Sequence, residues 1–217
     1  DWAQKDKETL EHGMESGVLA GVVRFFDMPN TAPATLTTEE AVRQRLSDAD
    51  AAADAVEKAT GVRPSYHLYA GVTDDERQVE AMVALHGGLF PAVIGLKCFA
   101  GHSTGRMGII EAERQRNVFR TLSHAGYAGV LAMHCEKESL LVPGLDSPDD
   151  ARAHGMARPA IAEEESVRDQ IRFAEEVGFK GTLHVCHIST RGALAAVREA
   201  RKEGIVRVTC GVTPHHA

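Results

Sequence analysis

The sequence predicts an α/β fold in which residues 1–217 form one domain, part of a (β/α)8 barrel. Three observations lead to this prediction. Short apolar runs alternate with helical segments along the chain. Reactive side chains stand at the carboxyl ends of several of these runs, as they do in barrel enzymes. No G-x-G-x-x-G turn follows the first run, which weakens the alternative of a doubly wound dinucleotide-binding sheet.

Each predicted element has a local basis. The first helix has Leu10, Met14 and Val18 at roughly helical spacing, and a threonine before Glu39 marks a helix start. The strands are short and mostly apolar, as buried parallel strands are. In chain order the predicted elements are helix 4–19, strand 22–26, helix 37–59, strand 65–69, helix 74–85, strand 92–99, helix 109–124, strand 129–134, a polar loop at 141–160, helix 161–177, strand 182–188, helix 190–203 and strand 206–212.

Six predicted strands are two fewer than a closed barrel contains. The sequence starts at Asp1 rather than at methionine, and it stops at Ala217 without a tail. We therefore expect a segment of a longer chain, with the missing strands of the barrel supplied from beyond these residues.

Composition restricts the possible partners. A net charge of -7 offers no basic surface for a nucleic acid. No apolar stretch approaches the roughly 20 residues that cross a bilayer, and no signal peptide is visible, so no membrane partner is expected. The cysteines form no CxxC pair and lie in predicted strands, where reduced thiols pack as small apolar groups. A cytoplasmic location fits such thiols best.

Three polar residues near the ends of successive strands form a candidate metal centre. Because alternate side chains of a strand share a face, pointing Lys97, His134 and His187 into the barrel mouth sends the adjacent thiols toward the helices. Those thiols belong to Cys98, Cys135 and Cys186. A lysine ammonium in the mouth would carry a large desolvation cost, and carbamylation would turn it into an anion able to bridge two metal ions. Imidazole is the commonest metal ligand.

Plainer explanations stand beside this one. A lysine at a strand end is commonly a solvated charge, and a lone histidine is commonly packed or exposed. His184 is predicted to face away from His187. His215 and His216 either line the mouth or form a loop pair, and His102 lies in a glycine-bounded loop that either covers a substrate or is a surface turn.

Five segments together resemble the dihydroorotases of the cyclic amidohydrolase superfamily. They are residues 27–31 with Pro33, 95–97, 134–136, 184–189 and 209–216. Their order along the chain matches the family, and the match spans nearly the whole sequence. The Asn30-Thr31 pair favours dihydroorotase over allantoinase or hydantoinase relatives, although an asparagine after a strand also commonly caps a turn.

The resemblance implies reversible hydrolysis of the cyclic amide of dihydroorotate to carbamoyl-aspartate, a step of pyrimidine synthesis. It implies two zinc ions bridged by an N6-carboxylated Lys97, with His134 and His187 on the second ion and Asn30 holding the substrate carboxylate. Such ions polarise a carbonyl and lower the pKa of water. Cobalt and manganese accept the same ligands, so the metal is left open. A homo-oligomer or an association with aspartate transcarbamoylase is also implied.

The sequence departs from the family at three places. The first-strand His-x-His, with its substrate arginine, is expected before Asp1. The aspartate that acts as general acid and base is expected beyond Ala217, so no catalytic residue is assigned and this segment alone is expected to be inactive. Gly211 stands where a glutamate is common. Two alternatives remain, a hydrolase of another cyclic amide such as allantoin or a hydantoin, and an inactive homologue that serves as a partner subunit.

Overall fold

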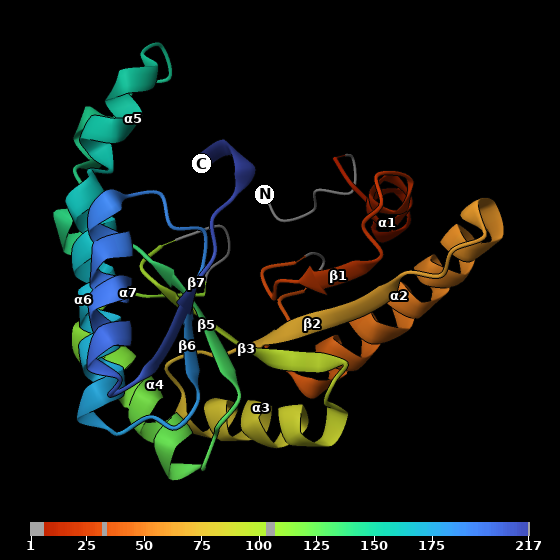
Figure 1. The fold of residues 1–217 in the computed structure, drawn as a ribbon, viewed down its shortest axis with the longest axis horizontal. Helices are drawn as coiled ribbons and strands as arrows, with labels where there is room; N and C mark the ends of the chain where they lie inside the picture. The colour runs from red at the N-terminus through yellow and green to blue at the C-terminus, as the bar shows by residue number, and fades with distance from the viewer. Residues whose placement is uncertain (1–6, 32–33, 103–106, 217) are drawn as a thin grey trace.

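The computed structural model places a parallel sheet at the centre of the chain, with helices packed along its outer face (Figure 1). It describes residues 7–31, 34–102 and 107–216. The strands are β1 (Arg24–Asp27), β2 (Ser65–Gly71), β3 (Val93–Ala100), β4 (Gly108–Ile109), β5 (Val130–Cys135), β6 (Thr182–Val185) and β7 (Arg207–Cys210). All of the pairings between them are parallel.

The strand order decides between the two folds that the sequence left open. The main path through the sheet is β1-β2-β3-β5-β6-β7, and the short β4 pairs with the end of β3. A doubly wound sheet reverses its order at a switch point, whereas a barrel adds each new strand beside the previous one. The observed order follows the chain throughout, so the prediction of a partial barrel with six main strands is confirmed.

Capping residues mark the ends of several helices. They are α1 (Leu10–Leu19), α2 (Glu39–Thr60), α3 (Glu76–Leu89), α4 (Ala112–His124), α5 (Ala151–Ala157), α6 (Ala160–Glu176) and α7 (Arg191–Glu203), with 3-10 turns at Glu138–Leu140, Pro143–Leu145 and Pro214–His216. At the start of α2 the Thr38 hydroxyl accepts a hydrogen bond from the Ala41 amide. The helix ends at Gly61, whose φ of 76° suits a residue without a side chain. None of the described helices is long and apolar enough to cross a membrane.

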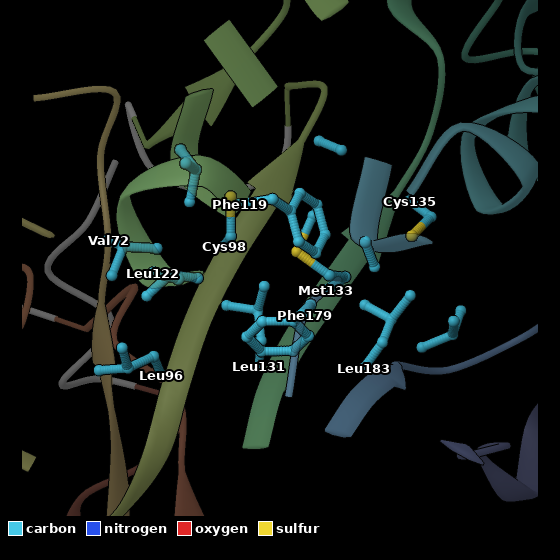
Figure 2. Close-up of a cluster of buried hydrophobic side chains, with 14 of the residues drawn as sticks. Val72, Leu96, Cys98, Phe119, Leu122, Leu131, Met133, Cys135, Phe179 and Leu183 are labelled. Carbon is cyan, nitrogen blue, oxygen red and sulfur yellow. The ribbon is translucent and has the colours of Figure 1, made fainter. Parts of the chain in front are cut away.

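The main hydrophobic core lies between the sheet and the helices. Figure 2 shows Leu96 and Cys98 of β3 and Leu131 and Met133 of β5 in this core, together with Phe119 of α4. These strand residues alternate with the ones that face the inside of the curved sheet. A smaller cluster at the β1 end joins α1 to α2, so both helices are held against the sheet there (Figure 1).

Several elements differ from the prediction. The first helix begins at Leu10, because Thr9 caps it by accepting from the His12 amide; residues 4–6 lie outside the described part of the chain. The segment 141–160 contains α5, which projects away from the sheet (Figure 1). The helix predicted from Ile109 begins at Ala112, since β4 occupies the preceding residues. The fifth main strand, β6, ends at Val185 rather than at residue 188.

Candidate metal centre

Lys97 lies on the inner face of β3 and is almost completely buried, with 2% of its surface exposed. Its neighbours in the sheet register are Gly71 on β2 and Ala132 on β5. Both residues are small, and the space over Gly71 is filled by the Met107 side chain. The adjacent Leu96 and Cys98 belong to the core under the helices, so Lys97 points the other way, as alternation predicted.

Among the described residues, the Lys97 ammonium has a thiol and an aromatic ring as neighbours. No carboxylate of these residues lies at contact distance. Its Nζ atom lies 3.5 Å from Cys186 Sγ and 4.4 Å from the centre of the Phe99 ring. Burial lowers the pKa of Lys97, and the nearby thiols oppose that shift only in part. The buried site therefore favours the neutral amine of Lys97 more than an exposed site would.

His134 comes from the regular part of β5. It pairs with Phe99 in the sheet register and lies on the same face as Ala132, which is the neighbour of Lys97. Burial lowers the pKa of His134 to about 3, and the positive charge of Lys97 adds to the shift. The imidazole is therefore neutral at physiological pH, and this is the form that binds metals.

His187 reaches the same place by another route. It lies beyond the end of β6 and has a φ of 38°, which is uncommon for a residue with a side chain. Hydrogen bonds hold the backbone on both sides, because Cys186 N donates to Met133 O at 2.9 Å and Ile188 N donates to Gly211 O at 2.8 Å. Burial, followed by the charge of Lys97, lowers the pKa of His187.

The two imidazoles meet with ring nitrogens facing one another. His134 Nδ1 lies 3.4 Å from His187 Nε2. Zinc binds imidazole nitrogen at about 2.0–2.1 Å in tetrahedral geometry, which places two nitrogens on one ion about 3.3–3.4 Å apart. The same separation is long for a direct hydrogen bond. The nitrogen spacing therefore fits a shared ion.

The ligand set is incomplete within the part of the chain that the structure describes. No group of three or more histidine, cysteine, aspartate or glutamate side chains that could hold a metal occurs in residues 7–31, 34–102 and 107–216. Two histidines and an unmodified lysine are too few donors for the metal sites common in proteins. A carbamate on Lys97 would add oxygen donors from within this chain.

The predicted orientation of β6 is wrong. Leu183 and Val185 belong to the core under the helices, so His184 and Cys186 face inward, opposite to the prediction. The His184 ring lies on the inner face of the sheet, where its Nδ1 is 2.9 Å from the Thr209 hydroxyl of β7. The alternating apolar pair Leu183 and Val185 was the signal in the sequence that could have revealed this.

Asn30 lies at the same edge of the sheet as the two histidines. It follows Pro29 directly after β1, and Leu36 N donates to Pro29 O at 2.9 Å, which folds this segment back toward the end of β2. Pro29 also lies close to Gly71, the register neighbour of Lys97. Pro33 of the same motif lies outside the described residues.

The other candidate histidines are exposed, and of these His216 lies near enough to His187 for its charge to lower the pKa of His187. His215 and His216 form an exposed 3-10 turn with ring centres 4.3 Å apart. His102 is exposed and its Nδ1 lies 3.0 Å from Glu138 Oε1. Residues 103–106 of the predicted glycine-bounded loop lie outside the described part of the chain.

Curated relatives cover nearly all of this chain. No protein-family model matches it. The dihydroorotase of Brevibacillus brevis is 33% identical over 213 residues, which are 97% of this chain and 45% of that protein. The dihydroorotase of Shouchella clausii is 32% identical over 97% of the chain and 44% of its own length, and the allantoinase of Bacillus velezensis is 28% identical over 98% and 44%. The chain spans less than half the length of these relatives.

Solved structures show the same architecture. The L-hydantoinase of Arthrobacter aurescens has a TM-score of 0.76 at 21% identity, covering 95% of this chain and 43% of that one. A D-hydantoinase from a Thermus species has a TM-score of 0.72 at 21% identity over 97% and 43%. At these identities the likeness bears on the fold alone.

Fold and sequence together define the class. The chain is a segment of a barrel of the type found in the cyclic amidohydrolase superfamily. Within that superfamily it resembles dihydroorotases at about 30% identity over most of its length, as the five motifs predicted.

Proposed function

We propose that the intact protein containing this chain is a metal-dependent dihydroorotase. The observation that carries the proposal is the pair of neutral imidazoles, 3.4 Å apart between facing nitrogens, above the buried Lys97. The named relatives and the Asn30-Thr31 motif support the choice of substrate. The reaction would open the cyclic amide of dihydroorotate to carbamoyl-aspartate, reversibly, as a step of pyrimidine synthesis.

Lys97 is proposed to act as an N6-carboxylated lysine. Burial favours its neutral amine, whose lone pair can attack the carbon of carbon dioxide. A nitrogen–carbon bond forms, one carbon–oxygen π bond becomes a lone pair on oxygen, and the proton leaves the nitrogen for solvent. The product is a carbamate anion in place of a buried cation, and this anion can be shared by two metal ions.

His134, His187 and the carbamate on Lys97 would together hold zinc, with two ions per intact subunit. When bound, zinc supplies Lewis-acid polarisation of the amide carbonyl and lowers the pKa of water. The chain's own residues keep the imidazoles neutral through burial and exclude water from around Lys97. Asn30 is proposed to bind the substrate carboxylate through its side-chain amide. No general acid or base is assigned within this chain.

Two other functions have specific support. A hydrolase of allantoin or of a hydantoin is favoured by the allantoinase relative at 28% identity. An inactive partner subunit is favoured by the incomplete ligand set in the described residues. Such a subunit could form a homo-oligomer or associate with aspartate transcarbamoylase, and co-purification of the intact protein with that enzyme would test this.

Hydrolysis assays on the intact protein separate these functions. Zinc-loaded protein should open dihydroorotate faster than allantoin or hydantoin, with the Lys97→Ala variant as the inactive control. A preference for allantoin or hydantoin would favour the second function. No hydrolysis of any of the three by protein shown to contain zinc would contradict both enzymatic proposals.

A further inference from the structure

We propose that Glu136 and Arg158 form a positioning pair that holds the His134 imidazole with Nδ1 toward His187. Glu136 stands just after β5, and Arg158 stands between α5 and α6. The inference deepens the proposed function and rests on it, because the orientation of His134 affects chemistry only if this ring binds a metal.

The far nitrogen of His134 lacks a partner. His134 Nε2 is buried and forms no hydrogen bond to any described residue. For Nδ1 to bind a metal beside His187, the neutral ring must carry its proton on Nε2. A buried N–H without an acceptor is destabilising, so an acceptor is expected nearby.

Glu136 is the candidate for that acceptor. Its Oε2 atom lies 3.8 Å from His134 Nε2, about 0.6 Å beyond the usual limit of an N–H···O hydrogen bond. Catalytic hydrogen bonds are often long in apo structures and tighten when the substrate is bound. The Glu136 side chain is only 15% exposed, so water has little access to its oxygens.

Arg158 holds Glu136 in place. Its Nε donates to Glu136 Oε1 at 2.9 Å, and a second guanidinium nitrogen contacts Oε2. This two-point contact fixes the plane of the carboxylate. The same nitrogen lies 3.4 Å from the His102 carbonyl, and Glu136 N donates to Ala100 O at 2.9 Å. The carboxylate is thus fixed between segments that follow β3, β5 and α5.

This arrangement differs from an ordinary surface ion pair. Exposed pairs contribute little to stability. Here Glu136 Oε2 lies between the guanidinium and the free nitrogen of a candidate metal ligand. Carboxylates that accept from the second nitrogen of a metal-binding histidine orient the ring and increase its basicity.

Metal affinity of the intact protein tests the pair. Glu136→Gln should lower zinc affinity about 10- to 100-fold in a chelator competition and shift the visible absorption of the cobalt-loaded protein. Arg158→Gln should lower zinc affinity and shift the cobalt spectrum to a smaller extent. Arg158→Lys should retain part of the zinc affinity that Arg158→Gln loses. Asp169→Asn is the matched control, because Asp169 is 11% exposed and also pairs with Lys137 and Arg172, without contact to His134. Its zinc affinity and cobalt spectrum should not change.

A second measurement works without metal. In metal-free protein, 15N spectra of the histidine rings should show His134, assigned with a His134→Gln variant, mainly in the form protonated at Nε2. Glu136→Gln should move this ratio toward the Nδ1-protonated form, and Asp169→Asn should not. An unchanged ratio, or an unchanged zinc affinity in Glu136→Gln, would overturn the inference. Failure of the unsubstituted protein to hydrolyse dihydroorotate would contradict only the proposed function, since the tautomer ratio does not depend on activity.

Discussion

His134 and His187 arrive at the same point from backbones of different kinds. His134 is part of β5 and keeps the strand's alternation, so its orientation follows from its position in the sequence. His187 comes after β6 has ended and depends on a positive φ and on two flanking hydrogen bonds. The comparison shows that alternation predicts which way a side chain points only as far as the strand continues.

The thiols next to the three candidate ligands show the same contrast. Cys98 and Cys135 lie in the core under the helices, as predicted. Cys186 instead lies against the Lys97 amine on the inner face. The pattern of polar group inside and thiol outside therefore holds for β3 and β5 and fails for β6.

The largest expected effect on metal affinity comes from Lys97, whose charge acts on both histidines. Lys97→Ala in the intact protein should lower zinc affinity by more than about 100-fold, the upper range for the loss of an outer-shell partner, because a bridging anion would be absent. Elemental analysis and chelator competition measure this. Lys180→Ala, an exposed lysine at the other edge of the sheet, is the control. Equal metal content in both variants would contradict the carbamate role.

A serine scan of the thiols sharpens the contrast between β3 and β6. Cys98→Ser should destabilise the protein by about 1–3 kcal/mol, because a hydroxyl would be buried in an apolar core. Cys186→Ser should cost at most about 1 kcal/mol, since its hydroxyl can accept from Lys97 Nζ. Urea denaturation of the metal-free intact protein measures both. Equal costs would indicate that Cys186 also lies in the apolar core.

Glycine and alanine substitutions probe the two backbones directly. At position 187 glycine should be more stable than alanine by about 1 kcal/mol, because a positive φ strains a residue with a Cβ atom. At position 134, inside a strand, alanine should be the more stable by about 0.5–1 kcal/mol. Neither pair retains a metal ligand, so the differences report only on the backbone. If alanine were the more stable variant at both positions, residue 187 would not keep its positive φ.

The smallest expected effect concerns a buried histidine away from the centre. Burial lowers the pKa of His86, whose ring packs against Tyr127. Below a pH of about 6.5 the unfolded chain therefore binds a proton that the folded protein resists, and stability falls as the pH falls. His86→Leu should make unfolding free energy less dependent on pH in this range. An unchanged slope would show that His86 titrates normally in the folded protein.

Local patterns explain why much of the fold could be predicted. Apolar runs, threonine caps and terminal glycines act within a few residues, so the main strands and most helices follow from neighbours in the chain. β4 could not be predicted this way, because its two residues are too few for a periodic signal and are held by pairing with the end of β3. The helix α5 interrupts a polar, proline-containing segment, and its seven residues are too few for a clear periodic signal.

By itself the sequence determined the order of the elements, the inward direction of Lys97 and His134, and the resemblance to dihydroorotases, because period and motif are properties of adjacent residues. Tertiary structure alone decided that β6 stops at Val185, that His187 turns to face His134, and that Glu136 lies between Arg158 and an unpaired imidazole nitrogen. Those features depend on hydrogen bonds and ion pairs between residues far apart in the chain, and such contacts exist only once the sheet has formed.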